Sequence, residues 1–194
     1  MLETLTQIDQ ALSLTINHFH APWLDAVMIV ISHKLTWIPL YALLCFLLFN
    51  KYDTRVFGVI LIMVVINIVL TDQISVAMKF GLERLRPCHN ESIIDILHMP
   101  IGCGGEFGFV SSHAANTAGL ATLMILLLRK NWIGITMTAY AVLNSYSRVY
   151  LAKHYVGDVV GGMILGLLIG FVVFKLSELI IQKLLKHRET IHED

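Results

Sequence analysis

Residues 147–158 read SRVYLAKHYVGD and place an Arg, a His and an Asp between two long apolar segments. Charged groups at membrane depth cost free energy and are seldom kept there without a role. His154 and Asp158 are four residues apart, so they share one face of a helix. A carboxylate one turn from an imidazole can hold its Nδ1–H and leave Nε2 free to attack. This stretch indicates either a catalytic group or a structural ion cluster between helices.

The composition around this stretch is that of a membrane protein. The chain has 194 residues, of which 56% are hydrophobic and 14% are charged, and its mean hydropathy is +0.71. Soluble domains carry about 25% charged residues. The formal net charge is zero, so no basic surface argues for binding to nucleic acid. We expect a single all-α domain over residues 1–194, built as a polytopic membrane helix bundle.

Apolar runs recur along the chain, and a bilayer-crossing helix needs about 20 such residues. The run 23–49 is interrupted at Ser32-His33-Lys34 and predicts either one broken span or two short helices. With further spans expected at 56–78, 114–128, 132–150 and 157–181, the bundle has five or six transmembrane helices. An N-terminal amphipathic helix, lying at the interface or packed on the bundle, is indicated by the apolar residues Leu2, Leu5, Ile8, Leu12 and Ile16.

Two more polar segments carry related groups. Lys79 and Arg86 are seven residues apart, which is two helical turns, and Pro87 follows. Residues 109–113 read FVSSH and bring two hydroxyls and a second His just before an apolar run. With Arg148, whose planar cation suits phosphate, the three segments supply the groups needed for phosphoryl transfer without a metal.

Together the three segments resemble the type 2 phosphatidic acid phosphatase family, whose pattern is K-x6-RP, PSGH and SR-x5-H-x3-D. The first and third parts are complete, as Lys79…Arg86-Pro87 and Ser147-Arg148…His154…Asp158. In the second part Val110 and Ser112 replace the family's Pro and Gly, while Ser111 and His113 are present. The resemblance covers residues 79–158, and its three-part spacing is specific.

The resemblance implies a metal-independent lipid phosphatase that needs no cofactor. His154 is expected to attack phosphorus and form a phosphohistidine, Asp158 to orient it, and His113 to protonate the leaving oxygen. The phosphate-binding residues are expected to be Lys79, Arg86, Ser111, Ser112 and Arg148. The implied partners are the bilayer and a membrane lipid phosphate. That lipid stays open among undecaprenyl pyrophosphate, lipid A phosphate, phosphatidylglycerophosphate and phosphatidic acid, and the oligomeric state is not indicated.

Two other functions use similar charges. A transporter or flippase passes an anionic lipid headgroup, and an inactive scaffold keeps the fold without the reaction. The complete set of Lys, Arg, His and Asp residues favours an enzyme over a scaffold. The motifs also cluster at one membrane end, whereas transport sites usually lie near the midplane, which favours an enzyme over a transporter.

Basic residues predict the orientation in the membrane. The three motif segments lie on one side of the membrane. The other side carries Lys51, Arg55, Arg129, Lys130, Lys183, Lys186 and Arg188. The positive-inside rule places that side and the C-terminus in the cytoplasm. We expect a multi-pass protein of the bacterial inner membrane whose site faces the periplasm or exterior.

Cys88 and Cys103 lie 15 residues apart in the outer loop. In an oxidising compartment such a pair predicts a disulfide, with Cα atoms roughly 4.4–6.8 Å apart. Free thiols, or a zinc site that adds His89 and His98, are the alternatives. The zinc alternative is weaker because the adjacent Cys88 and His89 fit one tetrahedral metal poorly.

Overall fold

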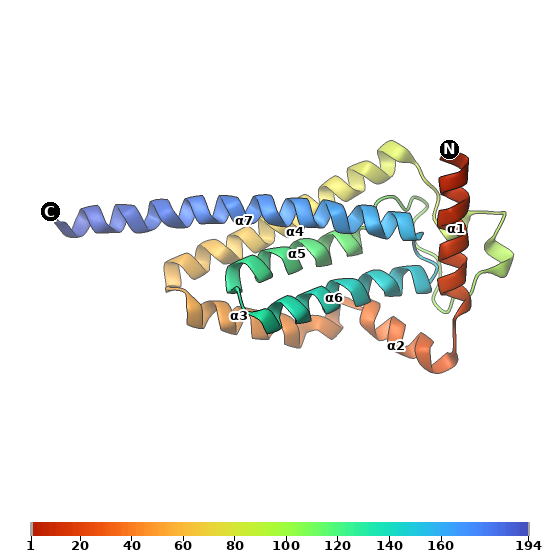
Figure 1. Cartoon of the computed structure of the whole chain (residues 1–194), viewed down its shortest axis with the longest axis horizontal. Helices are drawn as coiled ribbons and strands as arrows, with labels where there is room; N and C mark the ends of the chain where they lie inside the picture. Colours follow the sequence, from red (N-terminus) through yellow and green to blue (C-terminus); the bar gives the residue numbers. More distant parts are fainter. Residues whose placement is uncertain (1, 194) are drawn as a thin grey trace.

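A computed structural model describes residues 2–193, and Figure 1 shows most of its helices packed lengthwise. The described residues form seven α-helices: α1 (Leu2–His18), α2 (Pro22–Ser32), α3 (Ile38–Lys51), α4 (Thr54–Leu82), α5 (Ser112–Leu128), α6 (Asn131–Tyr150) and α7 (Val156–Glu193). Three short 3-10 turns join them: η1 (Lys34–Trp37), η2 (Pro87–His89) and η3 (Ile94–Ile96). Within residues 2–193 there is no β-strand, so the all-α prediction is confirmed.

The helices α4 and α7 are long and apolar enough to cross a bilayer. The pair α2 and α3 qualifies as a third, broken crossing, with a bend of 69° between its halves. The bend falls where the sequence is interrupted by His33 and Lys34. The helix α5 is apolar but has only 17 residues. The chain is a membrane helix bundle, and five or six crossings remain a prediction.

Local signals set the ends of the helices next to the site. Asp53 caps α4 by accepting hydrogen bonds from two backbone N–H groups, and Glu83 ends that helix in a left-handed conformation at φ 48°. Ser111 caps α5, so this helix begins at Ser112, slightly before the expected Ala114. At the other end of the chain α7 continues to Glu193, through residues expected to form a polar tail. These boundaries leave residues 83–111 as one long connection over the end of the bundle.

The helix α5 lies at the centre of the bundle and packs against α4, α6 and α7. Its closest neighbour is α7, which faces it with three glycines at four-residue spacing. A Cβ on Gly162 would lie 2.5 Å from the Ser111 carbonyl oxygen, and one on Gly170 would lie 2.6 Å from the Gly119 carbonyl oxygen. Small residues at this spacing let two helix backbones approach in a membrane. The glycines thus hold the start of α7 beside the start of α5.

The helix α1 lies across the end of the bundle that is opposite the C-terminus (Figure 1). Some of its polar side chains face the protein, and of these Ser13 and Asn17 are buried. Asn17 donates to the carbonyl oxygens of His98 and Tyr150, at 2.8 and 2.7 Å. The apolar side chains on the outward face are 51–58% exposed, and they are Leu5, Ile8 and Leu12. The helix is packed on the bundle, but through its polar face.

Candidate active site

The three motif segments meet at the end of the bundle where α1 lies (Figure 1). The connection 83–111 returns on itself through an antiparallel bridge between Leu85 and Phe107. Two backbone hydrogen bonds fix this turn, from Arg86 N to Glu106 O at 3.0 Å and from Gly108 N to Arg84 O at 2.8 Å. The bridge carries the first motif back over the start of α5.

His154 and Asp158 form a buried pair at the turn between α6 and α7, with His154 only 3% exposed and Asp158 fully buried. The Nδ1 atom of His154 lies 3.5 Å from Oδ2 of Asp158, an ion-pair distance that is too long for a full hydrogen bond. The backbone N–H of Tyr155 donates to the same oxygen at 3.0 Å. Because Nδ1 faces Asp158, Nε2 is the ring nitrogen left for a substrate.

The surroundings of His154 favour its neutral form. Burial lowers the pKa of His154 to about 4; the cations Arg86 and Arg148 act in the same direction, while Asp158 opposes the shift. A neutral imidazole keeps the lone pair that attacks phosphorus. Once phosphorylated, the ring gains positive charge and Asp158 can stabilise it.

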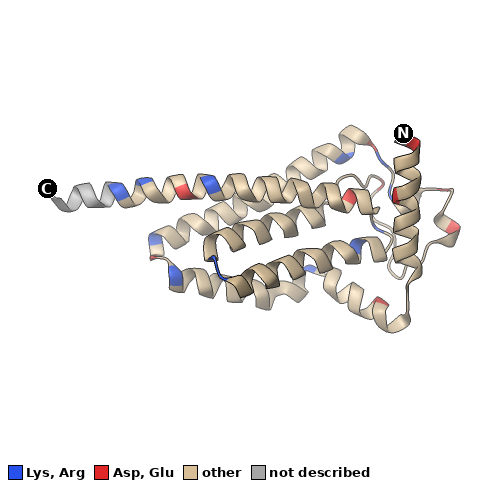
Figure 2. Cartoon of the chain, viewed as in Figure 1, with Lys and Arg blue, Asp and Glu red and all other residues tan. Residues whose placement is uncertain are grey.

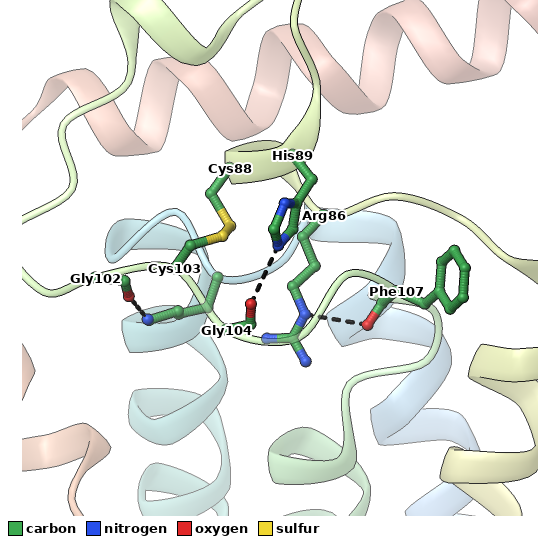
Figure 3. The surroundings of a disulfide bond; sticks show 8 residues. Arg86, Cys88, His89, Gly102, Cys103, Gly104 and Phe107 are labelled. Atoms are coloured by element: carbon green, nitrogen blue, oxygen red, sulfur yellow. Dashed lines mark hydrogen bonds between the residues drawn. A yellow bond between two sulfur atoms is a disulfide. The ribbon is translucent and has the colours of Figure 1, made fainter.

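Arg86 is held in place by another part of the connection 83–111, in which it lies. Its Nε donates to the Phe107 carbonyl oxygen at 3.0 Å (Figure 3). A Cβ at position 104 would lie 2.5 Å from Nη1 of Arg86, so a larger residue there would displace the guanidinium. Burial lowers the pKa of Arg86, and Asp158 opposes this shift. An arginine stays charged despite such a shift, so Arg86 is a fixed cation beside the His154–Asp158 pair.

Arg148 and Lys79 reach the same region from α6 and α4. Arg148 donates from Nη1 to the Ser32 hydroxyl at 2.5 Å, and its buried Nε has no hydrogen-bond partner among the described residues. Such a donor suits an anionic oxygen. Lys79 donates to the Ser112 hydroxyl at 2.5 Å. Ser112, which stands where the family has Gly, therefore orients one of the predicted phosphate-binding cations.

The start of α5 supplies the other predicted groups. Ser111 is fully buried, and its hydroxyl accepts from the backbone N–H of Ala114 at 3.5 Å. The first N–H groups of a helix and its dipole bind anions. His113 lies in this first turn, close enough to His154 and Arg148 to interact with them electrostatically. The structure therefore brings the predicted site residues to one end of the bundle.

Two basic residues that the sequence did not assign to the site also lie there. Arg84 forms an ion pair with Asp158, from Nη1 to Oδ1 at 2.7 Å. Lys153 is buried and donates to the Gly102 carbonyl oxygen. Arg84 is two residues before Arg86, and Lys153 precedes His154, but neither position belongs to the motif spacing. Adjacency to motif residues was the only available signal.

A disulfide joins Cys88 to Cys103, with Cα atoms 5.8 Å apart (Figure 3). This separation lies within the range expected from the sequence. His89 lies beside the disulfide, with its Nε2 3.1 Å from the Gly104 carbonyl oxygen. His98, which the zinc alternative required, instead pairs with Asp25 at 2.8 Å and stacks on His20. The disulfide closes the part of the connection whose Gly102 carbonyl group holds Lys153, and it lies between Arg86 and the residues 106–107 that hold Arg86.

We predict that reduction of this disulfide lowers both thermal stability and turnover without removing a catalytic atom. Closing a 15-residue loop stabilises by up to about 3 kcal/mol. The closed loop also joins Arg86 to the Glu106 and Phe107 carbonyl groups that hold it. Melting temperature and phosphate release should be measured with and without a reductant. Cys88→Ser should have the melting temperature and turnover of the reduced wild type, and reductant should not change them. Cys45→Ser should respond to reductant as the wild type does. Equal melting temperatures of oxidised and reduced protein would contradict the prediction.

A cavity of about 670 Å³ adjoins the site. Its walls come from α3, α4, α5 and α6 and consist mainly of apolar side chains, among them Leu44, Leu48, Val64, Leu120 and Met124. His113 and Asn116 lie in its wall near the start of α5. A phosphoryl group at the cation-lined site can therefore stay attached to an apolar chain that lies in the cavity.

Fold and site together define a membrane helix bundle with a cation-lined polar site built on a buried His–Asp pair. The sequence matches the PAP2 superfamily over residues 55–181, and the chain belongs to this superfamily. This confirms the resemblance seen over residues 79–158.

Two relatives and one solved structure are similar over most of the chain. The sequence is 38% identical to a lipid A 4'-phosphatase of Bacteroides thetaiotaomicron over 169 residues, which cover 86% of this chain and 75% of the relative. It is 31% identical to a lipid A 4'-phosphatase of Porphyromonas gingivalis over 176 residues, which cover 90% of this chain and 75% of the relative. A PAP2-type phosphatidylglycerolphosphate phosphatase from Bacillus subtilis superimposes with a TM-score of 0.71 at 28% identity, covering 91% of this chain and 88% of that one.

Proposed function

We propose that the protein is a metal-independent phosphatase that removes a phosphoryl group from a membrane lipid through a phosphohistidine intermediate. The observation that carries the proposal is the buried His154–Asp158 pair, with Arg86 and Arg148 close enough to act on its charge. This is the arrangement needed to attack a phosphate ester and to bind the charge of the transferred group.

In the first step, Nε2 of His154 attacks phosphorus and the bond from phosphorus to the lipid oxygen breaks. The imidazolium form of His113 is the acid that this step needs, and it donates its proton to the departing oxygen, so the lipid leaves as an alcohol. Lys79, Arg86 and Arg148 bind the phosphoryl oxygens, together with Ser111 and the N–H groups at the start of α5. Asp158 stabilises the positive charge on the phosphorylated ring.

In the second step, the phosphohistidine is hydrolysed. His113, now neutral, takes a proton from a water molecule whose oxygen attacks phosphorus. The bond from phosphorus to Nε2 breaks, inorganic phosphate leaves, and neutral His154 is restored. Because three side-chain cations bind the phosphoryl oxygens, the scheme requires no metal.

The proposed substrate is a lipid A 4'-phosphate. The mainly apolar cavity next to His113 supports a substrate with an apolar anchor. The two lipid A 4'-phosphatases described above support lipid A over the other candidates. Undecaprenyl pyrophosphate and phosphatidylglycerophosphate present similar headgroups and are the alternatives to be compared.

The site is proposed to face the periplasm in a bacterial inner membrane. Figure 2 shows Lys and Arg positions (blue) at the end of the bundle remote from α1, around the α3–α4 and α5–α6 turns and on α7. The positive-inside rule assigns that end to the cytoplasm. The outward apolar face of α1 (Leu5, Ile8 and Leu12) then lies at the periplasmic surface of the inner membrane, as the apolar face of an interfacial helix would.

Phosphate release from a panel of lipids tests the proposal. Purified protein in detergent, with excess EDTA, should release phosphate fastest from lipid A, ahead of undecaprenyl pyrophosphate, phosphatidylglycerophosphate and phosphatidic acid. His154→Asn serves as the blank. A faster reaction with another lipid would overturn the substrate, and a requirement for a divalent ion would overturn the metal-free scheme. Phosphate release no greater than that of the blank would overturn the phosphatase itself.

A further inference from the structure

Arg84 bridges two carboxylates that come from opposite ends of the chain. Its Nη1 lies 2.7 Å from Oδ1 of Asp158, and its Nη2 lies 2.6 Å from Oδ2 of Asp9. Its guanidinium carbon also lies 4.6 Å from the centre of the Tyr155 ring. The guanidinium is therefore held by α1, by the start of α7 and by the turn that carries His154.

The two oxygens of Asp158 have different partners. Oδ1 accepts from Arg84, while Oδ2 accepts from the Tyr155 N–H at 3.0 Å and faces Nδ1 of His154 at 3.5 Å. The carboxylate is fully buried, and a Cβ on Gly108 would lie 2.8 Å from Oδ2. The hydrogen bond from Arg84 thus fixes which oxygen of Asp158 faces the nucleophile.

Asp9 joins this arrangement to the N-terminal helix. Its Oδ1 accepts from the Gly157 N–H in the first turn of α7 at 2.7 Å, while Oδ2 binds Arg84. A Cβ on Gly157 would lie 2.7 Å from Oδ2 of Asp9, so a larger residue at this position would push the Asp9 carboxylate away. The exposed fractions of the Asp9 and Arg84 side chains are 15% and 27%, so solvent screens the pair only in part.

We infer that Asp9 and Arg84 are positioning residues for the reaction, acting on His154 through Asp158. The inference rests on the proposed function. Asp9 holds the Arg84 guanidinium in the position from which its Nη1 donates to Asp158. The positive charge of Arg84 also compensates the negative charges of the two carboxylates beside the site. Neither residue contacts the transferred phosphoryl group. The N-terminal helix α1 therefore contributes one positioning residue, Asp9, although it lies outside the three motifs.

Asp9→Asn tests this role most selectively. The amide oxygen of Asn can still accept from the Gly157 N–H, so the hydrogen bond to the first turn of α7 is kept, while the charge and the acceptor that hold Arg84 are both lost. Misplacement of a catalytic group by a fraction of an ångström has large effects, so we expect kcat to fall about ten-fold. KM should change less than about two-fold, because the cations that bind phosphate are untouched. Asp9→Glu should restore part of the rate.

Ser13→Ala is the matched control. Ser13 lies one turn along α1, where its hydroxyl donates to the Asp9 backbone carbonyl oxygen at 2.7 Å and accepts from the Val156 N–H at 2.9 Å. Its loss removes a contact between the same helices but leaves the Asp9 carboxylate and Arg84 paired. Its kcat should equal that of the wild type, and both variants should melt within a few degrees of it. In an Asp158→Asn background, Asp9→Asn should cause no further loss, because the effect passes through Asp158.

The outcomes distinguish the positioning role of Asp9 and Arg84, which we call the relay, from the proposed function. If Asp9→Asn has the kcat of the wild type, the relay is overturned while the proposed phosphatase activity is not. A ten-fold loss that persists in the Asp158→Asn background, or that Ser13→Ala shares, would overturn it as well, since the effect would then be structural. A wild-type protein that releases no more phosphate than His154→Asn would overturn the proposed function and the relay with it.

Discussion

His154→Ala should abolish phosphate release, with a loss of at least about 10⁴-fold in kcat. Removal of the nucleophile leaves only the binding groups, and such losses in other enzymes are of this order or larger. The side chain is buried, and Ala removes a polar ring whose Nδ1 lacks a full hydrogen bond, so the protein should stay folded. Turnover and melting temperature of the purified variant should be measured together.

Asp158→Asn should leave more activity than His154→Ala, with a loss of roughly 10²–10⁴-fold. The substitution keeps the shape of the side chain but removes the charge that stabilises the phosphorylated ring. His33→Ala is a matched control, because it removes an exposed imidazole outside the motifs and should turn over like the wild type.

If His154→Ala keeps more than a few per cent of wild-type turnover, the covalent scheme is wrong.

The parts of the site that the sequence predicted are those whose geometry is local or set by motif spacing. His154 and Asp158 are four residues apart and contact each other, although His154 precedes α7 and does not share a helix with Asp158 as expected. A contact between such near neighbours, and the spacing within each motif, can be read from a single segment. The apolar runs likewise predicted the helices to within a few residues at most of their ends.

The parts that could not be predicted depend on tertiary contacts between distant segments. Arg84 contacts Asp158 across 74 residues of sequence and Asp9 across 75 residues, and no spacing rule relates the three. The packing face of α1 was also not predictable, because apolar surface is as stable against lipid as against protein. In a membrane protein the polar face of a helix can therefore be the inner one.

Gly166→Ala should lower the melting temperature by about 10 °C or more, an effect expected from severe overpacking in a chain of this size. A Cβ at this position would lie 2.8 Å from the Gly119 backbone nitrogen and 2.9 Å from the Ala118 Cβ, and would also collide with the Ala115 carbonyl oxygen. Backbone atoms cannot move aside as a flexible side chain can, so α7 must shift away from α5. Thermal unfolding in detergent measures the loss.

Gly58→Ala is the matched control, since Gly58 lies in the long apolar helix α4 and a Cβ there meets nothing within 4 Å. Because alanine favours a helix over glycine by about 0.5–1 kcal/mol, this variant should melt at or slightly above the wild-type temperature. Equal melting temperatures for the two variants would contradict the proposed role of the glycine face in packing.

The packing of α7 on α5 should also control activity. Asp158 lies two turns before Gly166 on α7, and its carbonyl oxygen accepts from the Ser111 N–H at 2.9 Å. A shift of α7 therefore moves the His154–Asp158 pair relative to Ser111 and His113 at the start of α5. A displacement of about 1 Å between catalytic groups can cost about 10²-fold in rate. Gly166→Ala should thus lose turnover even at temperatures where it remains folded, whereas Gly58→Ala should not.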